Sequence, residues 1–184
     1  MIARESTMHE IFLPEAKPAL EWVNNRVLQK VSPRLKHSLA QSRFVIALGT
    51  WADARGNGMA GPELHFQIQP PGEISRTLVP DVSFLSYRRM PREDQARIEV
   101  PRIAPDVVVE VRSPGDLTQD IEEKVRVYLA AGTEVVFLVD PETRSVTVRD
   151  HTGSRTVGED DVLEHEALAG FSLPARTLFE LPGG

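Results

Sequence analysis

Residues 107–114 read Val107-Val108-Val109-Glu110-Val111-Arg112-Ser113-Pro114 and give the strongest clue to the architecture. A short run of valines predicts a strand that is buried on both faces of a sheet. An ionised carboxylate is costly in such a strand, because an unpaired buried charge costs many kcal/mol. Glu110 is therefore expected to be paired, protonated, bound to a cation, or turned toward a cleft at the end of the strand.

The segments that follow this strand extend it into a larger unit. Helical spacing of apolar residues covers 118–131, a second continuous apolar strand is predicted at 135–139, and 145–149 is its hairpin partner. Two fully apolar strands joined by a helix are typical of a parallel βαβ unit. Further strands at 64–68 and 78–85 favour a mixed sheet. The predicted fold class is α/β, with a central mixed β-sheet flanked by helices.

Two helices are predicted in the first third of the chain. Pro18 suits a first helical turn, and apolar spacing continues over 19–29, although 27–31 could instead form a short strand. A second helix is expected from about 34 to 54. Residues 1–14 are expected to be a loose lead-in to a single domain that spans all 184 residues.

The composition excludes several classes of protein. The chain has no cysteine, which excludes disulfide frameworks, thiolate zinc sites and cysteine nucleophiles. A formal net charge of −6 argues against binding nucleic acid mainly through overall charge, but it leaves open a nuclease with a cation and a local basic rim. No run approaches the ~20 apolar residues of a membrane span, and residues 1–7 lack the apolar core of a secretory signal. A cytoplasmic protein without a membrane partner is expected.

Two acids and a lysine form the candidate site. Asp81 follows Pro80 in an apolar segment, much as Glu110 does in its strand. Lys124 lies at the edge of the apolar stripe of its helix, so its ammonium can reach the end of the strand that carries Glu110. Asp81 and Glu110 would bind Mg²⁺, with Mn²⁺ as a substitute and the backbone carbonyl of Val111 as a further ligand. The alternatives are a metal-free Glu110–Lys124 pair, a turn residue at Asp81 and a lysine that only covers apolar surface.

This combination of residues resembles the PD-(D/E)XK, or restriction-endonuclease-like, superfamily and, more narrowly, the Uma-type family of small bacterial endonucleases. The resemblance covers roughly residues 18–150. In the first half of the chain it is carried by Leu20-Glu21-Trp22-Val23, Ser32-Pro33, His37 and Val79-Pro80-Asp81-Val82-Ser83-Phe84. In the second half it is carried by Ala104-Pro105-Asp106 with the strand through Pro114, Asp120-Ile121-Glu122-Glu123-Lys124, Tyr128-Leu129-Ala130-Ala131-Gly132 and Phe137-Leu138-Val139-Asp140-Pro141. It implies a restriction-endonuclease-like core and a nuclease site.

The chain departs from the superfamily at one position. The usual lysine lies two positions after the second acid, where this chain has Arg112. The resemblance implies that Lys124 has taken over that role, while Arg112 is a second cation that cannot accept a proton. It also implies that Glu21, on the first predicted helix, lies close to the metal; the alternative is that Glu21 belongs to the solvated face of that helix. His37 is either an accessory member of the site or a packing residue.

We therefore expect a divalent-metal-dependent endodeoxyribonuclease that hydrolyses DNA phosphodiester bonds, acting as a monomer or a homodimer. A set of arginines could contact phosphates, or could belong to a charged solvated loop: Arg88, Arg89, Arg92, Arg97 and Arg102. The alternative function is a non-catalytic interaction module that retains a nuclease-like scaffold. A third is a metal-dependent hydrolase of another phosphate ester.

Overall fold

The computed structural model describes residues 10–181 and 183, and its centre is a six-stranded sheet in the order β10-β9-β8-β7-β6-β3. The strands are β3 (Gly58–Pro62), β6 (Val82–Ser86), β7 (Val107–Val111), β8 (Val135–Asp140), β9 (Ser145–Asp150) and β10 (Gly153–Gly158). β7 and β8 are parallel, and the other neighbours are antiparallel. The mixed sheet and the βαβ unit are thus confirmed.

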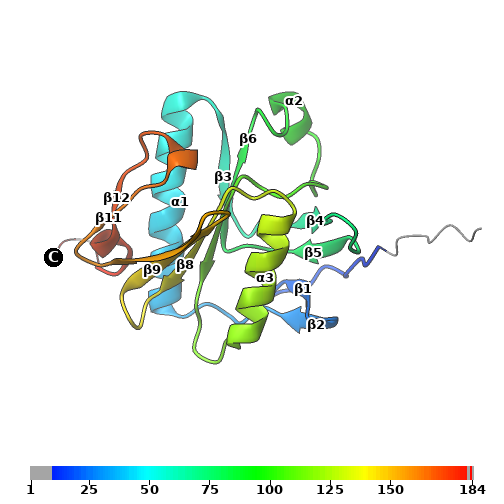
Figure 1. Ribbon diagram of the computed structural model, residues 1–184, viewed down its shortest axis with the longest axis horizontal. Coiled ribbons are helices and arrows are strands. Elements are labelled where there is room, and N and C mark those ends of the chain that lie inside the picture. Colours follow the sequence, from blue (N-terminus) through cyan, green and yellow to red (C-terminus); the bar gives the residue numbers. More distant parts are fainter. Residues whose placement is uncertain (1–9, 182, 184) are drawn as a thin grey trace, which may run out of the picture.

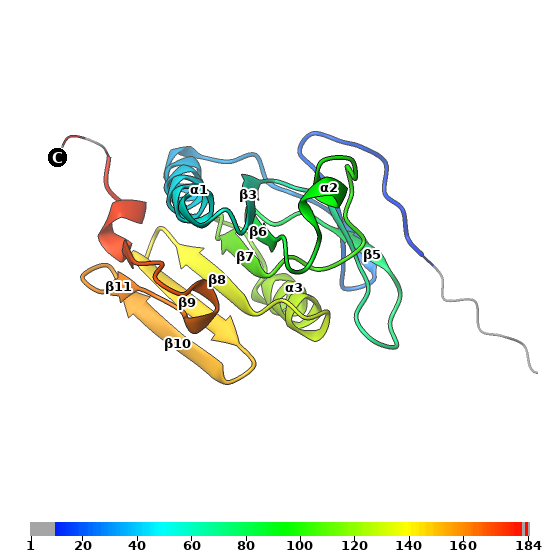
Figure 2. The same cartoon turned by 90° about the horizontal axis from the view of Figure 1, so that it is seen from above.

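Helices cover both faces of this sheet, as Figures 1 and 2 show. α1 (Leu35–Arg55) packs against one face, and α3 (Thr118–Ala130) packs against the other. Both were expected from apolar spacing, and their bounds agree with that expectation to within one residue at each end. No helix in the described part of the chain combines the length and apolarity needed to cross a membrane.

Short elements complete the second half of the chain. They are α2 (Arg92–Gln95), the paired strands β11 (Val162–Leu163) and β12 (Leu173–Pro174), and the 3-10 turns η1 (Glu166–Leu168) and η2 (Ala175–Leu178). Residues from β11 through η2 belong to the same apolar core as α1, so the C-terminal segment packs on the α1 side of the sheet. The α3 side of the sheet stays available for the N-terminal elements.

β7 faces two cores because side chains on a strand alternate between its faces. Val109 and Val111 belong to the core beneath α1, whereas Val108 belongs to the core beneath α3. Glu110 follows the same alternation and lies on the α3 side, where the hydroxyl of Tyr128 donates to its carboxylate. The strand therefore delivers one acid into the layer between the sheet and α3.

The prediction of a helix over 19–29 is wrong, because this segment forms a hairpin of β1 (Leu20–Val23) and β2 (Arg26–Gln29). Asn24 and Asn25 make the turn with φ of 48° and 58°. Asparagine tolerates this left-handed region better than most side chains, and two such residues suit a tight hairpin. Each strand has only four residues, so its alternation is too short to stand out from helical spacing.

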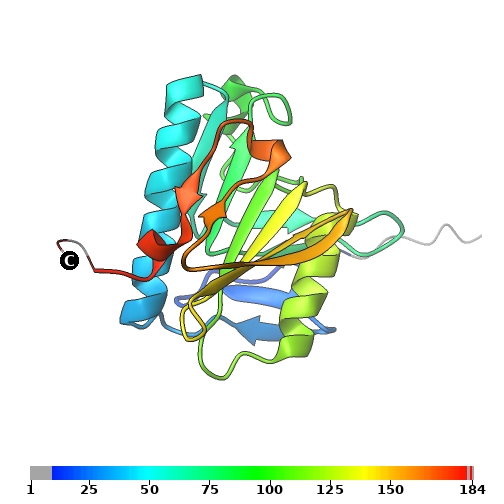
Figure 3. The same cartoon turned by 60° about the vertical axis from the view of Figure 1, so that its left-hand side comes forward.

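The hairpin lies beside the first turn of α3, as Figure 3 shows. The amide of Asn24 donates to one carboxylate oxygen of Asp120 at 2.8 Å, and Arg26 donates to the other at 2.7 Å. The short strand considered as an alternative at 27–31 overlaps β2. These contacts place the inner face of the hairpin over the end of the sheet where β7 stops.

The prediction of one strand over 78–85 is also wrong, because this segment belongs to two separate strands. β5 (Arg76–Leu78) pairs with β4 (Phe66–Ile68) in a separate small sheet, and β6 begins after a break. Pro80 lies in the break and has no N–H to donate to a sheet. Asp81 consequently lies just before β6 and not inside a strand.

The sequence pattern does not predict the two edge strands, β3 and β10. β3 contains two glycines and no apolar alternation. A Cβ at Gly58 would lie 2.5 Å from the carbonyl oxygen of Leu85, so close contact with β6 requires glycine there. Four of the six residues of β10 are exposed and it is bounded by glycines, which is typical of loops as well as of edge strands.

Part of the predicted lead-in over 1–14 can be placed. Residues 1–9, including the stretch 1–7 in which no secretory signal is expected, lie outside the described residues. From residue 10 onward the chain makes contacts with the body of the protein. Glu10 bridges to Ser75, and the N–H of Ile11 donates to the carbonyl of the same residue at 3.0 Å.

Candidate active site

The two predicted acids meet because β6 and β7 are antiparallel neighbours. Val82 at the start of β6 is paired with Val109 near the end of β7, so Asp81 lies beside Glu110 and the residue after it. Both acids and Lys124 line one cavity of about 260 Å³. The structure therefore brings together the three residues that the sequence singled out.

Asp81 closes the gap that the break before β6 leaves in the sheet. Its Oδ2 accepts the N–H of Val111 at 2.7 Å, a hydrogen bond that a longer β6 would otherwise provide. Its Oδ1 accepts from the ammonium of Lys30 at 2.6 Å, and Nε2 of His37 lies 3.4 Å from Oδ2. Burial would raise the pKa of Asp81, but the charge of Lys30 and the contact with His37 outweigh it and hold the pKa well below its usual range.

Glu110 lies at the base of the cavity with its side chain 11% exposed. The hydroxyl of Tyr128 donates to Oε1 at 3.1 Å, and Nζ of Lys124 lies 2.6 Å from the same oxygen. Burial raises the pKa of Glu110 to about 7, against the opposing effect of Lys124 and with the help of the nearby carboxylates of Glu21 and Asp81.

Glu21 is the second partner of Lys124, and it lies on β1 rather than on the helix expected for it. The ammonium of Lys124 lies 3.0 Å from each of its carboxylate oxygens. Oε1 of Glu21 also accepts the N–H of Val79 at 2.8 Å. Burial would lower the pKa of Lys124, but the carboxylates of Glu110 and Glu21 outweigh it and raise the pKa above its ordinary value. The charged form of Lys124 is therefore favoured.

Lys30 belongs to the same cluster, and sequence reasoning missed it. Besides contacting Asp81, its ammonium donates to the carbonyl of Val79 at 2.8 Å. Burial would lower the pKa of Lys30, but the charge of Asp81 outweighs it, so the pKa lies above its ordinary value. Lys30 would have been found if residues 20–29 had been predicted as a hairpin. Side chains alternate along a strand, so Lys30 lies on the same side as Arg26 and Leu28, which line the cavity.

The accessory residues occupy different positions in the site. His37, from the first turn of α1, is buried and contacts Asp81. Arg112 lines the cavity with its side chain 40% exposed, 3.7 Å from Asp140. Val111 is buried, and its N–H is the donor to Asp81. The cavity thus has a buried charged floor and a partly exposed arginine in its wall.

Two carboxylates of the cavity, those of Asp81 and Glu110, suit the binding of a divalent cation. Mg²⁺ is usually bound through one or two carboxylates while it keeps several waters, and Asp81 and Glu110 share a cavity with room for waters. Across residues 10–181 and 183, no three side chains among His, Cys, Asp and Glu are arranged to hold a metal ion. Glu21 does not complete such a set, because its oxygens are taken up by Lys124 and the backbone of Val79.

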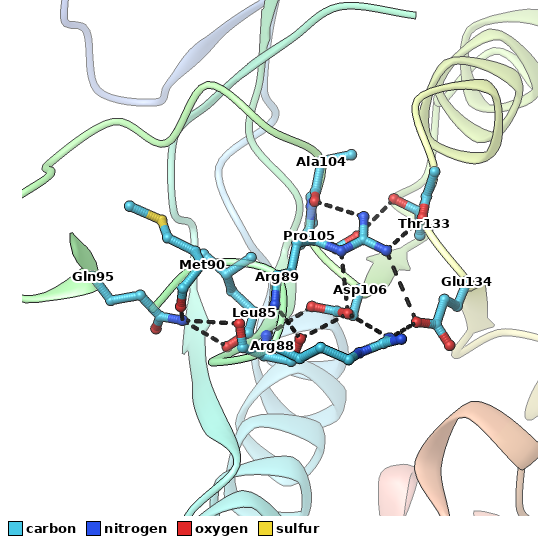
Figure 4. A network of polar contacts seen from close by, with 12 residues as sticks. Leu85, Arg88, Arg89, Met90, Gln95, Ala104, Pro105, Asp106, Thr133 and Glu134 are labelled. Atoms are coloured by element: carbon cyan, nitrogen blue, oxygen red, sulfur yellow. Dashed lines mark hydrogen bonds and ion pairs between the residues drawn. The ribbon is translucent and has the colours of Figure 1, made fainter. Parts of the chain in front are cut away.

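None of the five arginines of the predicted cluster lines this cavity. Figure 4 shows the network of polar contacts that Arg88 and Arg89 make instead. Arg89 lies 3.2 Å from Asp106, and Arg88 lies 2.5 Å from Glu134. Asp106 precedes β7, so it is four residues from Glu110, or roughly 13 Å along the strand. Arg88 and Arg89 thus connect the loop after β6 with the residues that precede β7 and β8, at the end of β7 opposite to Asp81 and Glu110.

Two of the other three arginines of the cluster form ion pairs, and the third has no ion pair with the described residues. Arg97 pairs with Asp94, and Arg102 pairs with Glu10. Arg92 opens the short helix α2 on the surface. The pairing of these side chains with neighbouring acids matches the alternative of a charged solvated loop better than a surface that contacts phosphates.

Comparison with known proteins supports the resemblance seen in the sequence. The family model Uma2, described as "Putative restriction endonuclease", matches residues 8–176. A similar solved structure is that of a protein described as "a putative nuclease belonging to DUF820" from Anabaena variabilis ATCC 29413. It is 27% identical, has a TM-score of 0.80, and the match covers 91% of this chain and 93% of that one. A search of curated proteins returned no match.

Proposed function

We propose that this chain, which belongs to the Uma2 family of restriction-endonuclease-like proteins, is a divalent-metal-dependent endodeoxyribonuclease. The observation that carries the proposal is the meeting of Asp81, Glu110 and Lys124 around one cavity. Two carboxylates and a fixed cation are what hydrolysis of a phosphodiester needs, because charge on the phosphoryl group must be neutralised and a water must be activated.

Asp81 and Glu110 would hold Mg²⁺ or Mn²⁺, with the carbonyl of Val111 as a further ligand. Once bound, the cation would polarise the phosphoryl oxygens and lower the pKa of a bound water. The N–H of Val111 orients Asp81, and the hydroxyl of Tyr128 orients Glu110, so both carboxylates are positioned before any ligand arrives.

Lys124 would act as a fixed positive charge. Its ammonium is held between Glu110 and Glu21, which favours the charged form and makes it unsuited to accept a proton from water. Its role would be to stabilise negative charge that develops on the phosphoryl oxygens. Arg112, partly exposed in the cavity wall, would contact the phosphate of the incoming strand through its planar guanidinium.

Cleavage of supercoiled plasmid tests the proposal. The purified protein should cut the plasmid with Mg²⁺ or Mn²⁺ and not with EDTA. Asp81→Ala, Glu110→Ala and Lys124→Met should each lower the rate by a factor on the order of 10²–10³, whereas Lys36→Met, in an exposed pair with Glu142, should leave it unchanged. Wild-type protein that cuts no DNA with either metal, or cleavage that survives all three active-site substitutions, would refute the proposal.

The products of the same assay bear on two further points. A monomer with one site should nick first, while a homodimer that presents two sites should give linear plasmid directly. Parallel reactions with RNA and with bis(p-nitrophenyl) phosphate separate a DNA nuclease from the third candidate, a hydrolase of other phosphate esters. Turnover of the small ester alone would favour that third candidate.

The rival function is a non-catalytic interaction module that retains a nuclease-like scaffold. One observation favours it: every carboxylate of the cluster already has an ammonium within 3.0 Å. Calorimetry separates the two functions, because an enzyme of the proposed kind binds Mg²⁺ or Mn²⁺ and loses that binding in Glu110→Ala. Absence of metal binding in the wild-type protein, both without DNA and with DNA present, would favour the interaction module.

A further inference from the structure

The site contains two buried lysines, and they hold their carboxylates in different ways. Lys124 bridges two acids, Glu110 and Glu21, and its side chain is 8% exposed. Lys30 contacts one acid, Asp81, and one backbone carbonyl, and its side chain is 12% exposed. Removing Lys124 from its place breaks contacts with two charged partners, whereas removing Lys30 breaks contact with only one. Lys30 is therefore the more exchangeable of the two ammoniums.

Lys30 occupies the one oxygen of Asp81 that the backbone does not use. Oδ2 accepts the N–H of Val111 and has His37 nearby, so Oδ1 is the oxygen that remains for a cation. The ammonium of Lys30 lies 2.6 Å from Oδ1. Because Mg²⁺ binds oxygen at about 2.1 Å, a metal ion on Oδ1 would lie next to this ammonium, and two positive charges would repel each other at close range.

We infer that Lys30 is an internal counter-ion that takes the place of the metal on Asp81 and must leave Oδ1 before a divalent cation binds. This inference rests on the proposed function, and it makes Lys30 the positioning residue that sets the metal affinity of the site. Metal-free protein keeps the buried carboxylate neutralised, since an unpaired charge at Asp81 would be costly.

The surroundings of Lys30 indicate where its ammonium goes when it leaves Asp81. Lys30 directly follows β2 and lines the cavity with Arg26 and Arg112, whose side chains are 41% and 40% exposed. A phosphate that enters the cavity would give the released ammonium a new acceptor. Binding of the metal and of a phosphodiester should therefore reinforce each other, because each favours the position of Lys30 that the other requires.

Calorimetric titration of the full-length protein with Mn²⁺, without DNA, tests this inference. Lys30→Met should bind Mn²⁺ about tenfold more tightly than the wild type, the size of a typical coupling between two sites. Lys30→Gln removes the charge but keeps a hydrogen-bond donor for Asp81, and it should shift the affinity in the same direction if Lys30→Met fails to fold. Lys30→Arg keeps the charge and should bind as weakly as the wild type.

A matched control excludes a general effect of removing a positive charge. Lys36→Met breaks an exposed ion pair with Glu142, in which the two atoms lie 2.9 Å apart, compared with 2.6 Å in the buried pair of Lys30 and Asp81. This substitution should leave the Mn²⁺ affinity unchanged. A thermal scan gives a second readout. Mn²⁺ should raise the melting temperature of Lys30→Met by more than it raises that of the wild type.

The outcomes are distinct. Tighter binding in the neutral variants, with or without measurable binding by the wild type, supports the inference. Wild-type binding that is unchanged or weakened in both Lys30→Met and Lys30→Gln overturns the role of Lys30 and leaves the nuclease proposal standing. Failure of the wild type and of every variant to bind Mn²⁺ overturns both.

Discussion

At the scale of single residues, the site depends on how three carboxylates and two ammoniums share a buried region. Glu21, Asp81 and Glu110 are each within 3.0 Å of Lys30 or Lys124. Burial of a charge is tolerated when it has a partner of opposite sign and its other hydrogen-bonding groups are satisfied. Removing one ammonium should therefore cost far more than removing a lysine from an exposed pair.

Lys124→Met tests this directly. It leaves two buried carboxylates without their shared cation, so the free energy of unfolding at neutral pH should fall by about 3–5 kcal/mol. Urea denaturation followed by circular dichroism measures the change. Lys36→Met, in an exposed pair, should cost less than about 1 kcal/mol. Equal costs for the two variants would mean that the buried pairs are not what holds this region together.

The sequence predicts four of the five side chains of this cluster: Asp81, Glu110 and Lys124 as the site, and Glu21 through the family resemblance. Lys124 was accessible because the apolar stripe of its helix is long enough to fix which side chains lie at its edge. Glu110 was accessible because a lone acid in a buried strand must find a partner. Lys30 could not be found while its segment was interpreted as a helix, since helical spacing does not place it on the same face as Glu21.

At the scale of elements, the hairpin of β9 and β10 is stabilised by a carboxylate at its turn, that of Asp150. Oδ1 of Asp150 accepts N–H groups of Thr152 and Gly153 at 2.7 and 3.0 Å, and Nε2 of His165 lies 3.0 Å from Oδ2. The hydrogen bonds from Thr152 and His165 hold the pKa of Asp150 well below its usual range. The ionised form of Asp150 therefore stabilises the fold.

The sign of the resulting pH dependence follows from the lowered pKa. An acid whose pKa is lower in the folded state contributes stability above its unfolded pKa, and this stability is lost as the pH falls through the folded value. Asp150→Asn should lower the free energy of unfolding at pH 7 by about 1–3 kcal/mol, and the difference from wild type should shrink as the pH falls below about 4. Urea titrations at several pH values measure it.

A nearby acid provides the control for this hairpin. Asp160 has a side chain that is 78% exposed and pairs with Arg176 at the surface. Asp160→Asn should change the stability at pH 7 by less than about 1 kcal/mol. A difference between Asp150→Asn and wild type that stays constant down to acidic pH would contradict the assigned role of the ionised carboxylate.

Elements with a sustained apolar pattern were predictable, whereas the four-residue strands β1 and β2 were not. The βαβ unit of β7, α3 and β8 has apolar patterns that agree over many residues, and its parallel pairing is confirmed. The β1–β2 hairpin consists of two four-residue strands around a two-asparagine turn, and its pattern was interpreted as a helix. The Asn24-Asn25 pair is the local signal that would have favoured the turn.

At the scale of the whole molecule, the position of Asp81 beside Glu110 depends on sheet register. Sequence patterns identify strands but do not state which residues face each other across them. The pairing of Val82 with Val109, and the break at Pro80, bring an acid from 29 residues upstream into the site. The net charge of −6 also means that contact with DNA would depend on local cations such as Arg26 and Arg112.

Asp81, Glu110 and Lys124 are proposed to surround a cation site. The most direct measurement is anomalous diffraction from crystals of the protein soaked in MnCl₂. One anomalous peak is expected within coordination distance of carboxylate oxygens of both Asp81 and Glu110, with Lys30 moved away from Asp81 and Lys124 still bound to Glu110. A peak elsewhere, or no peak while Lys30 still contacts Asp81, would contradict it.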